Sequence, residues 1–127
     1  MRHAQRDHIL RNNEVYEQLT HEAKTDLVSR ARAMVFPIQW PEPFGLVMVE
    51  AMACGTPVVA CPAGAAAELV EEGVTGFLRD SIDDLAAAVG RVGECSPAAC
   101  RERVARHFSA GAMVDGYEQL FRRVVGP

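Results

Sequence analysis

Two glutamates, with a glycine-containing turn between them, have the residue types and the spacing that suit ligand binding or catalysis. Glu42 and Glu50 are separated by seven residues, and a Pro-Phe-Gly turn (43–45) lies between them, directly before an apolar run from Leu46. The turn predicts the start of a helix, where the first backbone N–H groups have no partner within the helix and bind anions. One carboxylate at the mouth of this site and another two turns into the helix suit a ligand with phosphate and hydroxyl groups, such as a nucleotide sugar.

Each of these residues also has a plainer interpretation. Glu50 falls within an otherwise apolar helix, where a buried carboxylate without partners is costly. Ribose hydroxyls would supply donors, but a nearby backbone N–H or an arginine would also satisfy it, and Glu42 alone is most simply a solvated loop residue. Gly45 has no side chain, so the backbone there would approach a ligand closely. The helix dipole would favour a phosphate or an electronegative sugar hydroxyl at that point.

The composition argues against several classes of function. The chain has 127 residues, 49% apolar and 24% charged, with a net charge of −4, which is typical of one soluble domain or part of one. No basic stripe is present, so we expect no nucleic-acid partner. No apolar run approaches the ~18 residues of a membrane span, and the charged N-terminus lacks the apolar core of a secretory signal. We therefore expect a cytoplasmic protein with reduced cysteines; the four cysteines and four histidines show no metal-type spacing.

Strand and helix patterns alternate along the chain. The strand patterns are 14–19 (weak), 33–36 and 57–60 (both short apolar runs and therefore predicted to be buried) and a short strand from 77. The helical patterns are 20–31, 46–54 (apolar on nearly all sides and therefore predicted to be buried), 65–71, 81–92, one that begins after Ser96, and 109–125. This alternation predicts an α/β fold, a partial Rossmann-like three-layer domain with a short parallel sheet covered on both faces. No glycine-rich phosphate loop follows a first strand, so the chain corresponds to the C-terminal portion of such a domain.

The predicted topology brings two loops to one edge of the sheet. Ligands of open parallel sheets bind beyond the carboxyl ends of the strands. The loop after strand 33–36 leads to Glu42, and the loop after strand 57–60 leads to Gly64 and Glu68. Both loops leave the same edge, which predicts a pocket between them.

The segment EPFGLVMVEAMACGTPVVA (residues 42–60) resembles the signature of the GT-B retaining glycosyltransferases of the glycosyltransferase group 1 (GT4) family. The hallmark of that family is the E-x7-E motif, which Glu42 and Glu50 reproduce. Gly64, Glu68, the segment EGVTGFL (72–78) and the upstream ARAMVFP (31–37) fit the same pattern. The resemblance runs from about residue 20 to residue 78 and is loosely sustained to residue 121.

This resemblance implies transfer of a hexosyl group from a nucleotide diphosphate sugar to an acceptor hydroxyl, with retained anomeric configuration and no metal cofactor. It implies that Glu42 is the catalytic residue, facing the donor sugar, and that Glu50 holds the ribose hydroxyls. The N–H groups of Phe44, Gly45 and Leu46 would contact the sugar or the diphosphate. The helix at 109–125 resembles the C-terminal helix of the family, which reaches back toward the other domain.

The chain also departs from the family pattern. The family uses an N-terminal Rossmann domain, and an arginine–lysine pair that neutralises the diphosphate, and residues 1–19 are too few to hold them. We therefore divide the chain into an N-terminal segment without an assigned role (1–19) and the donor-binding part of a C-terminal domain (20–127), and we expect it to be inactive alone. The alternatives are a non-catalytic oligomerisation or complementation module, as a homodimer or with a partner domain, and a nucleotide-sugar epimerase of similar fold.

Overall fold

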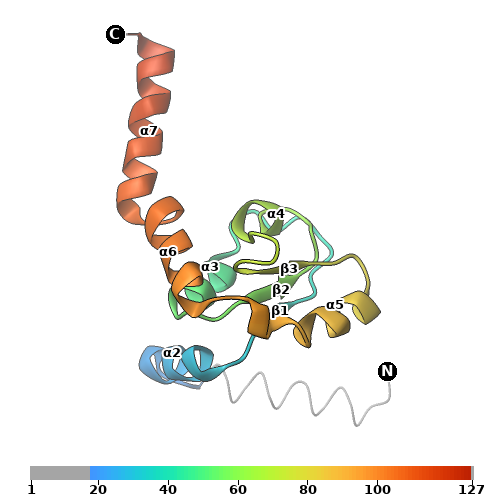
Figure 1. Ribbon diagram of the computed structural model, residues 1–127. Helices are drawn as coiled ribbons and strands as arrows, with labels where there is room; N and C mark the ends of the chain where they lie inside the picture. The colour runs from blue at the N-terminus through green and yellow to red at the C-terminus, as the bar shows by residue number, and fades with distance from the viewer. Residues whose placement is uncertain (1–17, 127) are drawn as a thin grey trace.

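A computed structural model describes residues 18–126 of the chain. Its sheet has three parallel strands in the spatial order β1-β2-β3 (Figure 1). The strands are β1 (Met34–Phe36), β2 (Val58–Ala60) and β3 (Gly76–Leu78). The predicted α/β fold with a short parallel sheet is confirmed. The strand predicted at 14–19 lies mainly outside the described residues, and residues 18–19 form a turn and a bend.

The helices begin and end close to the predicted positions. They are α2 (His21–Arg30), α3 (Leu46–Ala53), α4 (Ala66–Leu69), α5 (Ile82–Val89), α6 (Pro97–His107) and α7 (Ala110–Val125), with a 3₁₀ turn at Val92–Glu94. Four of them begin at a hydroxyl side chain that accepts a hydrogen bond from the N–H three residues later, namely Thr20, Ser81, Ser96 and Ser109. Such caps satisfy one of the unpaired donors of a helix start, which is why these sequence positions predict the boundaries.

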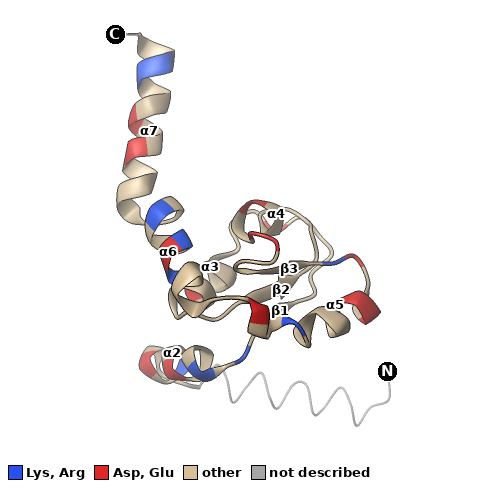
Figure 2. Ribbon diagram, viewed as in Figure 1, with Lys and Arg blue, Asp and Glu red and all other residues tan. Residues whose placement is uncertain are grey.

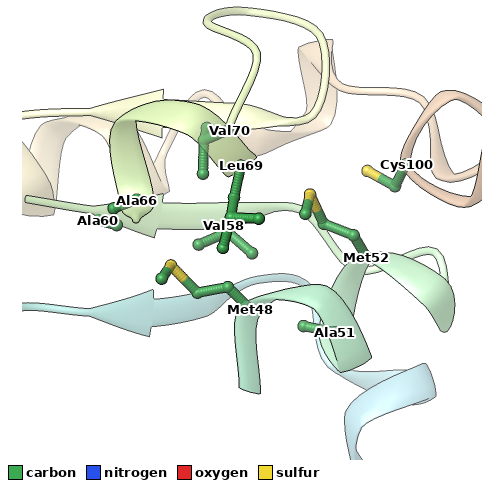
Figure 3. Packing of buried hydrophobic residues seen from close by; sticks show 9 residues of the cluster. All are labelled: Met48, Ala51, Met52, Val58, Ala60, Ala66, Leu69, Val70 and Cys100. Carbon is green, nitrogen blue, oxygen red and sulfur yellow. The ribbon is translucent and has the colours of Figure 1, made fainter. Parts of the chain in front are cut away.

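Two hydrophobic clusters hold helices to opposite faces of the sheet. Figure 3 shows Met48 and Met52 of α3 and Leu69 of α4 gathered around Val58 of β2, with Cys100 of α6 beside them. On the other face, Val59 and Phe77 pack against α5 and the 3₁₀ turn. Val58 and Val59 point to opposite faces because side chains alternate along a strand. The central strand therefore anchors both layers of helices.

Two predictions of burial are wrong. Only one side of α3 is buried, through Met48, Ala51 and Met52, whereas Leu46 is 67% exposed. The predicted helix is apolar on nearly all sides, but within residues 18–126 its outer side is covered only in part, by α2. Strand 33–36 was expected to be buried, yet Val35 is 48% exposed because β1 lies at one edge of the described sheet.

The last helix projects from the rest of the structure. α7 follows α6 after a bend at Phe108-Ser109 and then extends away from the sheet as a single helix (Figure 1). None of its residues is buried. The apolar side predicted for it is present but exposed.

Burial of the Cys100 thiol predicts a decline in stability at alkaline pH. Burial is the main cause that raises the pKa of Cys100 from 9.0 to about 11. Below pH 9 the thiol is protonated in the folded and in the unfolded chain. Above pH 9 the unfolded chain loses the proton first, so the free energy of unfolding falls as the pH rises toward 11. A shift of this size corresponds to about 2–3 kcal/mol.

We expect the urea midpoint of the wild-type chain to fall more between pH 8 and pH 10.5 than that of Cys100→Ala, which has no thiol at this position. Equal declines in the two proteins would show that the thiol does not titrate differently in the folded and unfolded states.

Candidate functional site

The start of α3 differs from the starts of the other helices of eight or more residues in the described range. Its first residue outside the helix, Gly45, has φ 65° and ψ 36°, and no side chain caps the helix. The N–H groups of Gly45, Leu46 and Val47 have no acceptor within residues 18–126. Its first turn contains no acidic residue. These consecutive donors and the positive end of the helix dipole form a site suited to an anion.

Gly45 fits this position for a steric reason. Its positive φ belongs to the left-handed region, which costs other L-residues roughly 1–2 kcal/mol. A Cβ at Gly45 would also lie 2.6 Å from Leu69 Cδ1 and 2.6 Å from Met48 Cε. The glycine therefore lets the loop enter α3 directly over the core.

Glu42 is held in place by the loop that follows β2. The N–H of Ala65 donates to the backbone oxygen of Glu42 at 2.7 Å. A Cβ at Gly64, where φ is +57°, would lie 2.4 Å from the backbone nitrogen of Glu42 and 2.5 Å from its oxygen. The two loops therefore meet beyond the carboxyl ends of β1 and β2, as predicted, and Glu42 is half-buried where they meet.

Glu50 is exposed, so the prediction that it is buried within its helix is wrong. It lies on the outer side of α3, which α2 covers only in part, and its carboxylate therefore needs no buried partner. Together with Cys54 and residues of α2 it lines a hollow of about 70 Å³, the α2 residues being His21, Lys24, Thr25 and Val28. The side chain is accessible to a ligand that enters this hollow.

One part-buried hydrogen bond positions α2 beside α3. Thr56 lies just before β2 and is 1% exposed, and its hydroxyl donates to the backbone oxygen of Val28 at 2.6 Å. This bond joins the last turn of α2 to the chain that enters the central strand. No sequence pattern marked His21 or Thr25 as site residues, because they look like the ordinary polar positions of an amphipathic helix.

The N–H donors at the start of α3 and the carboxylate of Glu50 lie at different heights along the axis of the same helix. Glu50 comes five positions after Gly45 along the helix, which corresponds to a rise of about 7.5 Å. A ligand that places an anionic group on the N–H donors can therefore place hydroxyl groups near Glu50 while it follows the side of α3.

A second hollow lies at the carboxyl ends of all three strands. It has a volume of about 290 Å³ and is lined by Gln39, Cys61, Pro62, Ala63 and Asp80. Ala63 immediately precedes Gly64, which contacts Glu42, so this hollow adjoins the loop that holds that glutamate. Asp80 was not identified from the sequence, because a single aspartate after a short strand has no distinguishing spacing.

Other polar groups near the site are structural. The guanidinium of Arg103 donates to the backbone oxygens of Leu69 and Glu68, at 2.7 and 2.9 Å, and so joins α6 to the end of α4. The Glu68 side chain is exposed. Within residues 18–126, no group of three or more histidine, cysteine or acidic side chains could hold a metal ion. No described helix is both long and apolar enough to cross a membrane.

Comparisons with known proteins identify the family of this chain. The family model of the glycosyl transferases group 1 matches residues 2–107. The D-inositol 3-phosphate glycosyltransferase of Mycolicibacterium smegmatis is 40% identical over 103 residues, which are 77% of this chain and 24% of that protein. The protein of the same name from Mycobacterium bovis is 39% identical over 123 residues, 85% of this chain and 25% of that protein.

A solved structure is also similar. Anabaena HepE in complex with UDP matches 80% of this chain and 29% of its own length, with 30% identity and a TM-score of 0.55. The chain thus spans about a quarter of the length of the curated relatives it matches. The match of the family model over most of the sequence, together with these identities, shows that the chain belongs to the group 1 glycosyltransferase family, whose members are enzymes.

Proposed function

We propose that this chain is the donor-binding part of a retaining glycosyltransferase that moves a hexosyl group from a nucleotide diphosphate sugar to an acceptor hydroxyl. The observation that carries the proposal is the uncapped start of α3 between Glu42 and Glu50. The similarity to HepE, whose structure contains UDP, supports a nucleotide as the ligand. The epimerase alternative has no support from the comparisons.

The proposed ligand follows the side of α3. The diphosphate would accept hydrogen bonds from the N–H groups of Phe44, Gly45 and Leu46, and its charge would interact favourably with the helix dipole. The ribose hydroxyls would donate to Glu50, and the rest of the nucleoside would lie across the hollow between α3 and α2. The sugar would face Glu42, beside the hollow that Asp80 lines.

The proposed reaction proceeds with retention on one face of the sugar. The bond from the anomeric carbon to the diphosphate oxygen breaks, the acceptor oxygen bonds to the same carbon, and the leaving diphosphate oxygen takes the acceptor proton. Glu42 would orient the sugar during this exchange. Residues 39–50 contain no lysine or arginine to stabilise the charge that develops on the diphosphate. We therefore propose that this chain binds the donor but needs basic groups from outside this segment for turnover.

Calorimetric titration with UDP, GDP, ADP and their glucose conjugates tests the proposal. We expect one nucleotide to bind the wild-type chain and to bind Glu50→Gln at least ~10-fold more weakly, because hydrogen bonds to a charged group contribute about 1.5–3 kcal/mol each. Glu102→Gln, a change on the exposed side of α6, is the control and should bind like the wild type. Absence of nucleotide binding, or equal affinities for the wild type and Glu50→Gln, would contradict the proposal.

A further inference from the structure

A hollow of about 370 Å³ lies at the amino ends of the strands, whereas Glu42 lies beyond their carboxyl ends. Arg32, just before β1, and Pro57, directly before β2, line it together with Arg101 of α6. Figure 2 shows in blue the basic segment between α2 and β1 on which Arg32 lies. This space is called the amino-end hollow below. Its volume falls within the roughly 300–1,000 Å³ of small-molecule sites, so a small organic ligand fits it.

The amino-end hollow carries positive charge that no acidic residue offsets. No acidic side chain of residues 18–126 lines it, although the whole chain has a net charge of −4. Six of the nine arginines in this range pair with a carboxylate. The three others are Arg32, Arg101 and Arg123, and the first two of them line this hollow. Neither makes a hydrogen bond or an ion pair within the described residues, so the N–H donors of both guanidiniums are available to a ligand.

The turn that ends α3 fixes the position of Arg101. A Cβ at Gly55, where φ is +82°, would lie 2.1 Å from Nη1 of Arg101 and 3.1 Å from its Cζ. The guanidinium therefore lies in the space that the missing side chain of Gly55 leaves open. Pro97, one turn earlier in α6, borders the same space at 3.2 Å from that Cβ. These contacts restrict the rotamers of Arg101, so it loses less conformational entropy when it binds a ligand.

The ends of α2 and α3 give a plainer reason for two arginines at this place. Ser29 lies in the last turn of α2, Cys54 directly follows α3, and both line the hollow. The carboxyl end of a helix carries a charge of about −0.5, which a nearby arginine offsets. α6 begins at the same hollow with Pro97, and a helix start contributes about +0.5. The two full charges of the arginines exceed these partial charges, so the hollow stays positive and suits an anion.

The lining favours a phosphate group on a compact apolar body. A guanidinium presents a planar fork of N–H donors that matches the oxygens of a phosphate. A phosphate monoester has nearly two negative charges and three free oxygens, so it can accept hydrogen bonds from both guanidiniums. The apolar side chains of Pro57, Val92 and Pro97 form other parts of the wall. They would contact the group that the phosphate esterifies.

We propose that the amino-end hollow binds a small phosphate monoester with a compact apolar group, held by Arg32 and Arg101. The hollow is separate from the site at Gly45, because the two lie at opposite ends of α3, a helix of eight residues and about 12 Å. The inference therefore does not depend on nucleotide binding, and the ligand takes no direct part in sugar transfer.

NMR titration with phenyl phosphate tests the site, because backbone amide signals show where a ligand binds. We expect the signals of Gly55 and Gly93, which line the hollow, to shift, while the signal of Gly45 reports separately on the start of α3. Sodium chloride at the same ionic strength should not produce these shifts. Inorganic phosphate should bind more weakly than phenyl phosphate, because it lacks the apolar group. Absence of shifts at Gly55 and Gly93, equal shifts with sodium chloride, or equal affinities for the two phosphates would overturn the proposal.

Replacement of the arginines tests their role in the same titration. We expect Arg32→Gln and Arg101→Gln each to weaken phenyl phosphate binding at least ~10-fold, because each removes charge-assisted hydrogen bonds. Arg101→Lys keeps the charge without the planar fork and should bind with intermediate affinity. Arg123→Gln removes the third arginine without a carboxylate partner in residues 18–126, on α7, and should bind like the wild type.

Urea unfolding verifies that all four variants remain folded. Equal affinities for the wild type and both glutamine variants at the hollow would show that the phosphate binds elsewhere. An equal loss in Arg123→Gln would show that only the overall charge of the chain matters. Either result would overturn the proposal.

Discussion

Gly76→Ala is expected to destabilise this chain by at least about 3 kcal/mol, a large part of the ~5–15 kcal/mol that stabilises a small domain. A Cβ at Gly76 would lie 1.8 Å from the backbone oxygen of Val58 and 2.8 Å from its carbonyl carbon. These are atoms of the central strand and cannot rotate away as a side chain can. The methyl group would force β3 from β2 and open both hydrophobic clusters, a larger disturbance than the ~1–3 kcal/mol of ordinary overpacking.

Urea unfolding followed by circular dichroism measures this effect. Gly93→Ala is the matched control, because a Cβ at Gly93 meets nothing within 4 Å and its φ is not positive. We expect the control to unfold close to the wild-type midpoint and Gly76→Ala to be largely unfolded in buffer or to have a much lower midpoint. Similar midpoints for the two variants would mean that β2 and β3 do not pair as closely as described.

The second large effect is expected for Gly64→Ala, which acts on the proposed sugar site. The new Cβ would meet the backbone of Glu42, and φ +57° adds strain for any residue with a side chain. The loop after β2 would have to move and Glu42 would move with it. We expect affinity for the nucleotide sugar to fall ~10-fold or more, whereas affinity for the nucleotide alone falls less, because Glu50 lies on α3 and not on this loop.

Gly73→Ala is the control that separates the effect of backbone strain from the effect of the contact with Glu42. Gly73 has φ +77°, but a Cβ there meets nothing within 4 Å. The control therefore has the same kind of backbone strain without displacement of Glu42. Calorimetric titration of both variants with the sugar nucleotide and the nucleotide should show the selective loss only in Gly64→Ala. Equal losses in both variants would indicate general destabilisation, and the assigned position of Glu42 relative to the sugar would be wrong.

The helix boundaries were predictable because local chemistry determines them. The hydroxyls of Ser81, Ser96 and Ser109 each accept a hydrogen bond from the N–H three residues later, and that interaction needs only neighbouring residues. The meeting of the loops at Glu42 was also predictable, because parallel strands direct their carboxyl ends to one edge. In both cases, the sequence contains the partners or the topology that decides the outcome.

The exposure of Glu50 was not predictable in this way. Burial of an apolar helix depends on the elements that cover it, and the pattern of α3 does not show which side remains open. Covering by α2 depends on the bond between Thr56 and Val28, which are 28 residues apart in the sequence. The hollow beside Glu50 therefore results from tertiary packing and has no local signal.

The uncapped start of α3 also has a cost for the stability of the empty protein. A side-chain cap typically contributes about 1 kcal/mol to helix stability, and α3 lacks this contribution. A bound anion would occupy the position that a serine or threonine hydroxyl takes in the neighbouring helices. Ligand binding and folding are then linked by mass action, so the chain gives up stability when empty and recovers it with the ligand.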